Sequence, residues 1–433
     1  MSRPQLAYVL QDSTAAHDRP NRLLLLLLLA AAMTSPWTGV RIAGLNLADF
    51  FLVASLALAL LLGLTRRVAV PMPWQFVVLP VVVLVLMGRD AVFFDRLPFQ
   101  TLEAAQFTTG DALGETVGGS ATFLVRLVLC WTAVGLSVGA FHRFPRALVS
   151  IIAAWLLGIA IGVSWSILQF TFALPDLPFV FHIDSAARAV GLTNHPNSLA
   201  ETIGVGLPLA VFLALGPRAG LVRRAGGCAL VVLSMWGLFL TGSRAGLAVG
   251  FFALVLSVII RLIWSGRGAW GLPLGLLSIV GAVLWLPSVW ATTRFSQGVA
   301  EASDSARVQA LTEGLGIFLR HPLGGAGLST WLGEMVPLIL LSGGGVILFA
   351  AFYSSLGSVF RRVWRARGQE LNAHLAGAGL VVLAFGLLNN GLVERYLYWP
   401  LIVGFYLASA RLRSSDPLET VESEPARTPN HSE

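Results

Sequence analysis

The chain contains a series of long apolar runs, most of which are close to the length that crosses a bilayer. A transmembrane helix needs about 20 consecutive apolar residues, and on that measure the sequence predicts about twelve spans. Hydrophobic residues make up 56% of the chain and charged residues only 12%, which is more apolar surface than one soluble core buries. We therefore expect an all-α, polytopic membrane protein. The predicted spans are residues 21–38, 45–64, 71–88, 119–141, 147–171, 198–216, 226–241, 244–264, 269–288, 331–355, 373–390 and 393–411.

The distribution of arginine predicts the orientation of these spans. The chain has 29 basic residues, and every one of them is an arginine. They gather in alternate gaps and in both tails, which predicts that these parts, both termini included, face the cytoplasm. Three longer segments, residues 89–118, 172–197 and 289–330, then face outward. We expect residues 1–411 to form a single transmembrane domain and the polar residues 412–433 to form a disordered cytoplasmic tail.

The lack of lysine excludes several chemistries. Without an amine side chain the protein has no Walker lysine for phosphate and no residue that forms a Schiff base. The net charge of +7 does not indicate nucleic-acid binding, because the arginines lie in short loops between apolar segments. Cys130 and Cys228 each lie inside an apolar run, which indicates packing rather than a disulfide or a metal site. We expect neither a metal nor a cofactor.

A polar stretch, "RAVGLTNHPNSLAE", runs from the second outer segment into the sixth predicted span at residues 188–201. Ser198 and Glu201 have the spacing of a capping box, so one interpretation is a well-capped helix. The other is an anion site, because a helix that begins at the outer face points its positive dipole end and free N–H groups at the water. Arg188 and His195 lie on the same loop.

A second polar stretch, "LTGSRAGLAVG", joins the seventh and eighth predicted spans. Thr241 to Ser243 predict a tight outer turn, and Arg244 falls in the first turn of the helix that follows. A cation beside a helix N-terminus is unfavourable by a few tenths to ~1 kcal/mol, and a bound anion relieves this. A snorkelling arginine at the membrane interface is the alternative interpretation.

Arg126 lies inside the fourth predicted span, in "ATFLVRLVLCW", roughly 10 Å below the outer surface. An arginine within the membrane costs at least ~2.5 kcal/mol and usually faces a partner or a water-filled cavity. We expect Arg126 to face a central polar cavity that opens outward. Pairing with Glu201 or with a loop carboxylate is the alternative.

The third outer segment predicts an amphipathic helix over residues 304–320 at the outer interface, because apolar residues recur at steps of three and four. These residues are Val308, Leu311, Leu315 and Leu319. Arg307 lies at the start of the helix and Arg320 at its end. The glycines of the following "HPLGGAG" predict a flexible entry into the tenth span.

Three of these stretches, in this order, resemble the O-antigen ligase and O-antigen polymerase superfamily of bacterial integral-membrane glycosyltransferases. They are "RAVGLTNHPNSLAE", "LTGSRAGLAVG" and "RVQALTEGLGIFLRHPLGGAG", and with the spans between them they cover roughly residues 120–355. The resemblance implies a GT-C-like, inverting, metal-independent enzyme in the bacterial inner membrane that works at the periplasmic face. It implies an undecaprenyl-pyrophosphate-linked glycan as donor and a glycan or lipid A-core as acceptor.

In such proteins outer arginines hold the donor pyrophosphate, a role that fits Arg188 and Arg244, with Arg307 and Arg126 as further candidates. Elementary chemistry supports this role. A pyrophosphate leaving group gains negative charge as the glycosidic bond breaks, so guanidinium groups already in place stabilise the transition state more than the ground state. An Asp-x-Asp metal motif is absent from the sequence, so arginines would supply this neutralisation.

The chain departs from the family pattern where the acceptor hydroxyl is activated. Family members typically carry a His-Asn pair just before the tenth span, whereas the corresponding "STWLGEMVPLILLSGGG" has no histidine. Glu334 occupies roughly that place and is one candidate for the general base. His321 and His195 are the others.

Two alternatives to an enzyme remain open from the sequence. A transporter or flippase for a lipid-linked saccharide would also place arginines in a cavity, but it should carry charges at mid-membrane in several helices. Arg126 is the main deep charge here, which favours an enzyme. A catalytically inactive partner of a polysaccharide export complex is the second alternative. Ligase and polymerase are not separated, because both break the same donor bond.

Overall fold

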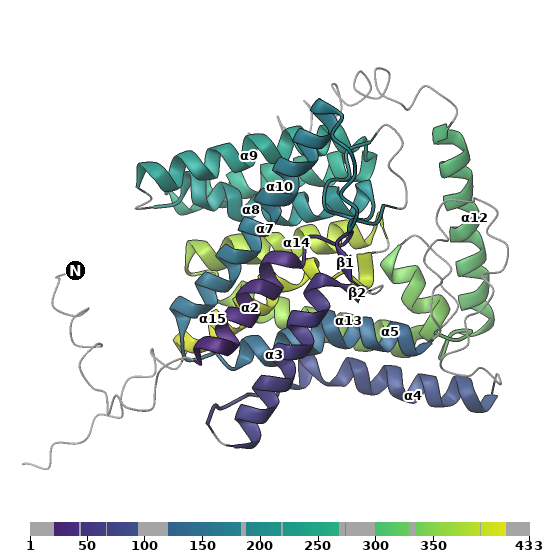
Figure 1. The fold of residues 1–433 in the computed structure, drawn as a ribbon. Helices are drawn as coiled ribbons and strands as arrows, with labels where there is room; N and C mark the ends of the chain where they lie inside the picture. The colour runs from purple at the N-terminus through teal and green to yellow at the C-terminus, as the bar shows by residue number, and fades with distance from the viewer. Residues whose placement is uncertain are drawn as a thin grey trace, which may run out of the picture.

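The computed structural model of the protein is mostly helical (Figure 1). It describes residues 21–42, 45–65, 67–93, 120–182, 188–217, 220–267, 273, 299–328, 335–389 and 391–412. Its α-helices are α2 (Arg22–Thr34), α3 (Leu47–Leu64), α4 (Val78–Phe93), α5 (Ser120–Leu127), α6 (Val134–Gly139), α7 (Pro145–Phe172), α8 (Pro196–Leu215), α9 (Leu221–Thr241), α10 (Arg244–Trp264), α12 (Val299–Arg320), α13 (Val336–Arg365), α14 (Glu370–Gly386) and α15 (Trp399–Leu412). The shorter elements are the 3-10 helices η1 (Trp74–Phe76), η5 (Gly391–Val393) and η6 (Arg395–Leu397), the π-helix η2 (Val128–Ala133), and the antiparallel strands β1 (Arg41–Ile42) and β2 (Leu45–Asn46).

Membrane-length helices dominate the described part of the chain. Seven of its helices are long and apolar enough to cross a bilayer, and three shorter apolar helices accompany them. The predicted all-α, polytopic membrane class is therefore confirmed. The predicted span 269–288 lies outside the described residues except for Pro273, so the total of about twelve spans stays a prediction. The predicted tail also lies outside them, apart from Leu412 at the end of α15.

Several predicted boundaries differ from the helices. The last predicted span, 393–411, begins too early, because residues 391–397 form η5 and η6 and the helix starts only at Trp399. The first predicted span, 21–38, is helical only to Thr34 and leads into the β1–β2 hairpin. The outer segment 89–118 begins as the end of α4, and its residues from 94 onward lie outside the described part. Polar residues inside apolar runs account for the first two differences.

Helix α8 lies at the centre of the bundle. It contacts α7, α9, α10 and α14. Of the residues in its most apolar 18-residue stretch, 78% are buried, the largest share among the seven membrane-length helices. Small residues permit this close packing, as is usual between membrane helices. Gly204 lies directly against the Phe385 ring, and Gly246 of α10 lies directly against Ala200. The start of α8 is therefore held by neighbours on several sides.

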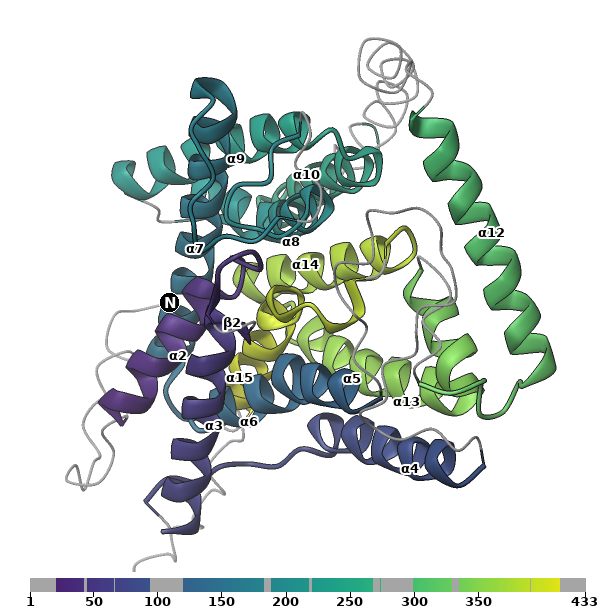
Figure 2. The same cartoon turned by 45° about the vertical axis from the view of Figure 1, so that its right-hand side comes forward.

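Helix α12 stands apart from the bundle. Figure 1 shows it upright beyond one end of the nearly horizontal α8, α9 and α10, at the end where the loop preceding α8 also lies. It contacts α13, and Figure 2 shows the same separation from a second direction. The four apolar residues predicted to share one face, Val308, Leu311, Leu315 and Leu319, are all exposed. The predicted helix and its apolar face are confirmed, and its position at the outer interface stays a prediction.

The glycine-rich stretch after α12 is held in place where it is described. Helix α13 is interrupted at Gly345, whose φ of 62° and ψ of −162° are not helical. The backbone on both sides of this break bonds the stretch: Ala326 N–H donates to the Ser342 carbonyl at 2.8 Å, and Val346 N–H donates to the Pro322 carbonyl at 2.9 Å. This differs from the predicted flexible entry, because the break in α13 supplies backbone partners that a sequence pattern does not reveal.

Replacing Gly345 with alanine is expected to destabilise the protein by about 1 to 3 kcal/mol, because its backbone conformation is essentially restricted to glycine. A Cβ there would also collide with the Leu323 carbonyl. Gly357→Ala in the same helix is the matched control, since a Cβ at Gly357 meets nothing within 4 Å and alanine favours the helix by up to ~1 kcal/mol. Thermal unfolding in detergent measures both. A Gly345→Ala variant as stable as the control would contradict the role of this break.

Candidate functional site

The start of α8 is capped by His195. Its Nδ1 accepts a hydrogen bond from Asn197 N–H at 3.0 Å, and Pro196 follows as the first helical residue. The predicted capping box of Ser198 and Glu201 is therefore wrong. The reason is that the helix begins three residues earlier than that motif requires, which leaves Glu201 in the second turn. A neutral His195 ring in this arrangement carries its proton on Nε2.

Arg188 links the loop before α8 to the end of α9. Its Nε donates to the Thr241 carbonyl at 2.8 Å, and its Nη2 donates to Asn197 Oδ1 at 3.1 Å. The neighbouring backbone follows the same path, because Ala189 N–H donates to the Leu240 carbonyl at 3.0 Å. Two nitrogens of the guanidinium are thus fixed against two different helix ends, which gives the group a defined position.

Arg244 begins α10, immediately after the turn that Arg188 contacts. Gly242 ends α9 in the left-handed conformation with φ 58°, and Ser243 caps α10 by accepting from Gly246 N–H at 3.1 Å. The predicted tight turn and the first-turn position of Arg244 are confirmed. A Cβ on Gly242 would lie 3.9 Å from Arg188 Nε, so the loop of Arg188 and the turn before Arg244 lie side by side.

These contacts place the first turns of α8 and α10 next to each other, with an arginine beside each. The packing of Gly246 against Ala200 brings the two N-termini together. Each N-terminus carries partial positive charge and N–H groups without intrahelical partners, and each guanidinium adds a full charge with planar donors. The electrostatic preference of the arrangement is for an anion with several oxygens, such as a diphosphate.

Thr38 and Gly39, just before the β1–β2 hairpin, support the loop before α8 from the other side. Thr38 Oγ1 donates to Asn194 Oδ1 at 2.7 Å and accepts from Asn194 N–H at 3.0 Å. Gly39 N–H donates to the Leu192 carbonyl at 3.0 Å, and its Cα lies too close to the Thr193 backbone for a side chain. The loop therefore keeps its shape through contacts with a segment about 150 residues away in the sequence.

A buried ion pair anchors this hairpin to the segment between α14 and α15. Arg395 Nε donates to Asp49 Oδ1, and Arg395 Nη2 donates to Asp49 Oδ2 at 2.7 Å. With its amide oxygen facing Arg395, Asn46 accepts from Nη1 at 2.8 Å and donates to the Thr38 carbonyl at 2.9 Å. Both partners of the ion pair are buried. The chain of contacts thus runs from Arg395 through Asn46 and Thr38 to the loop before α8.

The other predicted site residues lie elsewhere. Arg126 is half-buried near the end of α5, which contacts η5. Arg307 is half-buried in α12, and His321 is exposed directly after that helix. Glu334 lies outside the described residues. The structure therefore brings together Arg188, the turn before Arg244, and His195, and it does not place Arg307 or His321 on the same elements.

Glu201 is a buried carboxylate that the sequence assigned only to capping. Tyr396 Oη donates to its Oε2 at 2.6 Å, and Asn389 Nδ2 donates to its Oε1. These partners take the place of the predicted capping contact. Burial raises the pKa of the Tyr396 phenol well above its ordinary value, so this hydroxyl keeps its proton and acts as a donor. The polar "NNGLVER" at residues 389–395 between two apolar runs was the sequence signal for this contact.

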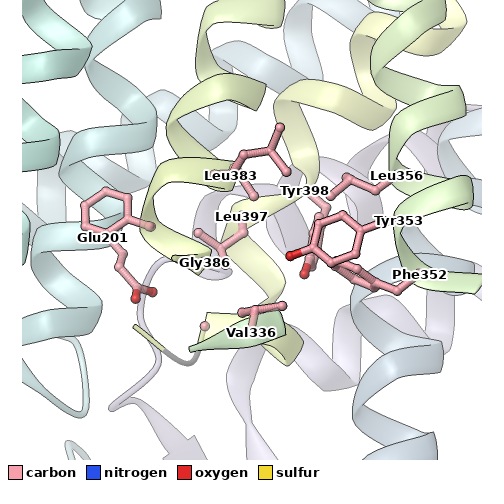
Figure 3. Close-up of a pocket in the computed structure, with 12 residues that line it drawn as sticks. Glu201, Val336, Phe352, Tyr353, Leu356, Leu383, Gly386, Leu397 and Tyr398 are labelled. Atoms are coloured by element: carbon pink, nitrogen blue, oxygen red, sulfur yellow. The ribbon is translucent and has the colours of Figure 1, made fainter. Parts of the chain in front are cut away.

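A small cavity of about 20 Å³ lies beside Glu201. Figure 3 shows Glu201 of α8 on one side and Tyr353 and Phe352 of α13 on the other, with Val336 below. A volume of this size holds about one water molecule. The other lining residues are mostly apolar, and Glu201 is the acidic side chain among them.

No cluster of three or more His, Cys, Asp or Glu side chains that could hold a metal occurs among the residues that the structure describes.

Comparison with known proteins finds a similarity to a known family over one segment of the chain. A family model described as O-antigen ligase matches residues 229–336, from α9 through α10 and α12 to the first residue of α13. No curated protein matches the chain significantly. The matched segment contains two of the three motifs noted in the sequence, with Arg244, Arg307 and His321, and it ends before the buried half of α13. Over this segment the chain is similar to the O-antigen ligase family, which supports a membrane protein of polysaccharide biosynthesis.

Proposed function

We propose that the protein transfers a glycan from an undecaprenyl-pyrophosphate carrier to an acceptor hydroxyl at the periplasmic face of the bacterial inner membrane. The observation that carries the proposal is the contact of Arg188 with both Thr241 and Asn197. Asn197 lies in the first turn of α8, and Thr241 lies just before the turn that leads to Arg244 at the start of α10. The family match supports glycan processing in a membrane. The acceptor is another glycan or a lipid A-core, and a polysaccharide export complex is a candidate partner.

The proposed reaction is a single displacement. The acceptor oxygen attacks the anomeric carbon from the face opposite the pyrophosphate, so the configuration inverts. The electron pair of the breaking bond goes to the pyrophosphate, whose added charge meets the guanidinium groups of Arg188 and Arg244 and the two helix N-termini. Because these groups are already in position, they stabilise the transition state without reorganisation. Arginines carry the neutralisation in this proposal, and no metal takes part.

Further roles of the predicted residues belong to the same proposal. Arg126 and Arg307 are candidates for additional phosphate contacts. His195, His321 and Glu334 stay candidates for the general base, although the Nδ1 of His195 already accepts from Asn197 N–H. We also propose that residues 1–411 form one transmembrane domain with cytoplasmic termini and outward-facing segments 172–197 and 289–330.

Reconstitution of the purified protein tests the function directly. With a polyprenyl-pyrophosphate-linked oligosaccharide and a glycan acceptor we expect transfer in the presence of a metal chelator, with inverted configuration at the new bond by NMR. Deletion of the gene separates the two acceptors: single unpolymerised repeats on the cell surface indicate a polymerase, and lipid-linked polymer without attachment indicates a ligase. Unchanged surface glycans after deletion, together with no transfer in vitro, would contradict the proposal.

A further inference from the structure

We propose that Glu201 is the general base that removes the proton from the acceptor hydroxyl, held in place by Tyr396 and Asn389. This inference rests on the proposed transferase function. The stretch where relatives typically carry a His-Asn pair has no histidine in this chain, and the inference gives the role of base to Glu201 instead of Glu334. It also gives a role to a carboxylate that is buried within α8, the most buried of the seven membrane-length helices.

Position is the first argument. Glu201 follows Asn197 by four residues, so the two side chains lie on the same face of α8, one helical turn or about 6 Å apart along the axis. Asn197 is the residue that accepts from Arg188. The carboxylate is therefore one turn deeper than the proposed pyrophosphate site, on the face that turns toward η5 and η6.

The hydrogen-bond partners of Glu201 are the second argument. Tyr396 and Asn389 each donate to a different carboxylate oxygen, and Gly391 leaves room beside Oε2, since a Cβ there would lie 2.7 Å away. A carboxylate has about four lone-pair sites, so two donors fix its orientation and leave acceptor capacity for a proton. A purely structural buried acid is usually paired with a cation, whereas the two donors described here are a phenol and an amide.

The cavity is the third argument. Glu201 lines a space of about 20 Å³ whose far wall is formed by α13, beginning with Val336. Space for about one water molecule is enough for a relay, because a general base acts either in direct contact with the proton or through one water.

The proton and the electrons balance in this step. The acceptor O–H gives its proton, through one water, to the Glu201 carboxylate while its oxygen forms the bond to the anomeric carbon. The bond from that carbon to the pyrophosphate oxygen breaks, and its electron pair leaves with the pyrophosphate. Glu201 then returns its proton to the released pyrophosphate or to water. The products are the glycosylated acceptor and the polyprenyl pyrophosphate.

Glu201→Gln in the full-length protein is the test. The substitution keeps the size of the side chain, and rotation of the Asn389 amide restores a hydrogen bond. We expect transfer to fall by about 100- to 10,000-fold while binding of polyprenyl pyrophosphate stays within about twofold of wild type. Tyr396→Phe, which loses one donor, should show a smaller loss. Glu313→Gln is the control and should keep wild-type activity, because Glu313 is half-buried in α12 and accepts from Gln309 of its own helix.

The outcomes separate this inference from the proposed function. Wild-type transfer by Glu201→Gln, or loss of donor binding together with transfer, would overturn the role of Glu201. Loss of transfer in Glu334→Gln with full activity in Glu201→Gln would assign the base to Glu334 instead. Transfer could depend on Glu201 while Arg188→Ala and Arg244→Ala still bind the donor as the wild type does. That result would support Glu201 as the base and contradict the pyrophosphate site at the arginines. No transfer by the wild-type protein would reject both.

Discussion

Replacing Arg188 or Arg244 with alanine is expected to lower the rate of glycan transfer by about 100- to 1,000-fold, the usual effect of removing one preplaced donor from developing charge. Each guanidinium lies beside a helix N-terminus, and both serve the same leaving group. The double variant should therefore lose less than the product of the two single losses, because groups that act on one charge are not additive. Initial rates of transfer with purified protein measure all three.

Lysine at position 188 should recover only part of the rate. The contacts of Arg188 with Thr241 and Asn197 use two nitrogens of one planar fork, and an ammonium group cannot reproduce that geometry. Arg320→Ala is the matched control, because this exposed arginine at the end of α12 bonds the Gly316 carbonyl of its own helix. Equal losses in Arg320→Ala and Arg188→Ala would show that general loss of positive charge, rather than this site, explains the effect.

Breaking the Asp49–Arg395 ion pair is expected to have the largest effect on stability. Asp49→Ala leaves a buried guanidinium without its carboxylate, which typically costs about 3–5 kcal/mol. It also releases the hairpin that positions the loop before α8, because Asn46 joins Arg395 to Thr38. We therefore expect a lower thermal midpoint in detergent and reduced binding of donor. Arg395→Ala should behave in the same way.

A double replacement tests the same interaction from the opposite direction. Asp49→Leu combined with Arg395→Met removes both charges, and exchange of a buried ion pair for apolar residues of similar size is often close to neutral. The double variant should therefore be markedly more stable than either alanine variant. Additive losses, with the double variant the least stable, would contradict a direct coupling between the two residues.

The apolar helices and their order were predictable because bilayer length is a strong constraint on sequence. The same holds for local features governed by one short motif. The Thr241–Ser243 turn needed a glycine in the left-handed conformation at Gly242, and the amphipathic face of α12 follows from residue spacing alone. The first turn of α10 was likewise correctly placed at Arg244.

Contacts between distant segments were not predictable from one sequence. Glu201 has the spacing of a capping box with Ser198, and this local pattern predicted a capping contact. Its actual partners, Tyr396 and Asn389, are nearly 200 residues away in the sequence. The predicted last span wrongly included Glu394 and Arg395, because apolar residues lie on both sides of them in the sequence. Their position outside α15 follows from the buried Asp49 on α3, and no rule of local spacing connects two residues so far apart in the chain.

Equilibrium binding of a short-chain polyprenyl pyrophosphate to the purified, detergent-solubilised protein tests the central claim most directly, because it needs neither the acceptor nor the general base. We expect saturable binding that inorganic pyrophosphate competes away, at least tenfold weaker in Arg188→Ala and in Arg244→Ala, and unchanged in Arg320→Ala. Affinity equal to that of wild type in the Arg188→Ala and Arg244→Ala double variant would contradict a pyrophosphate site between the first turns of α8 and α10.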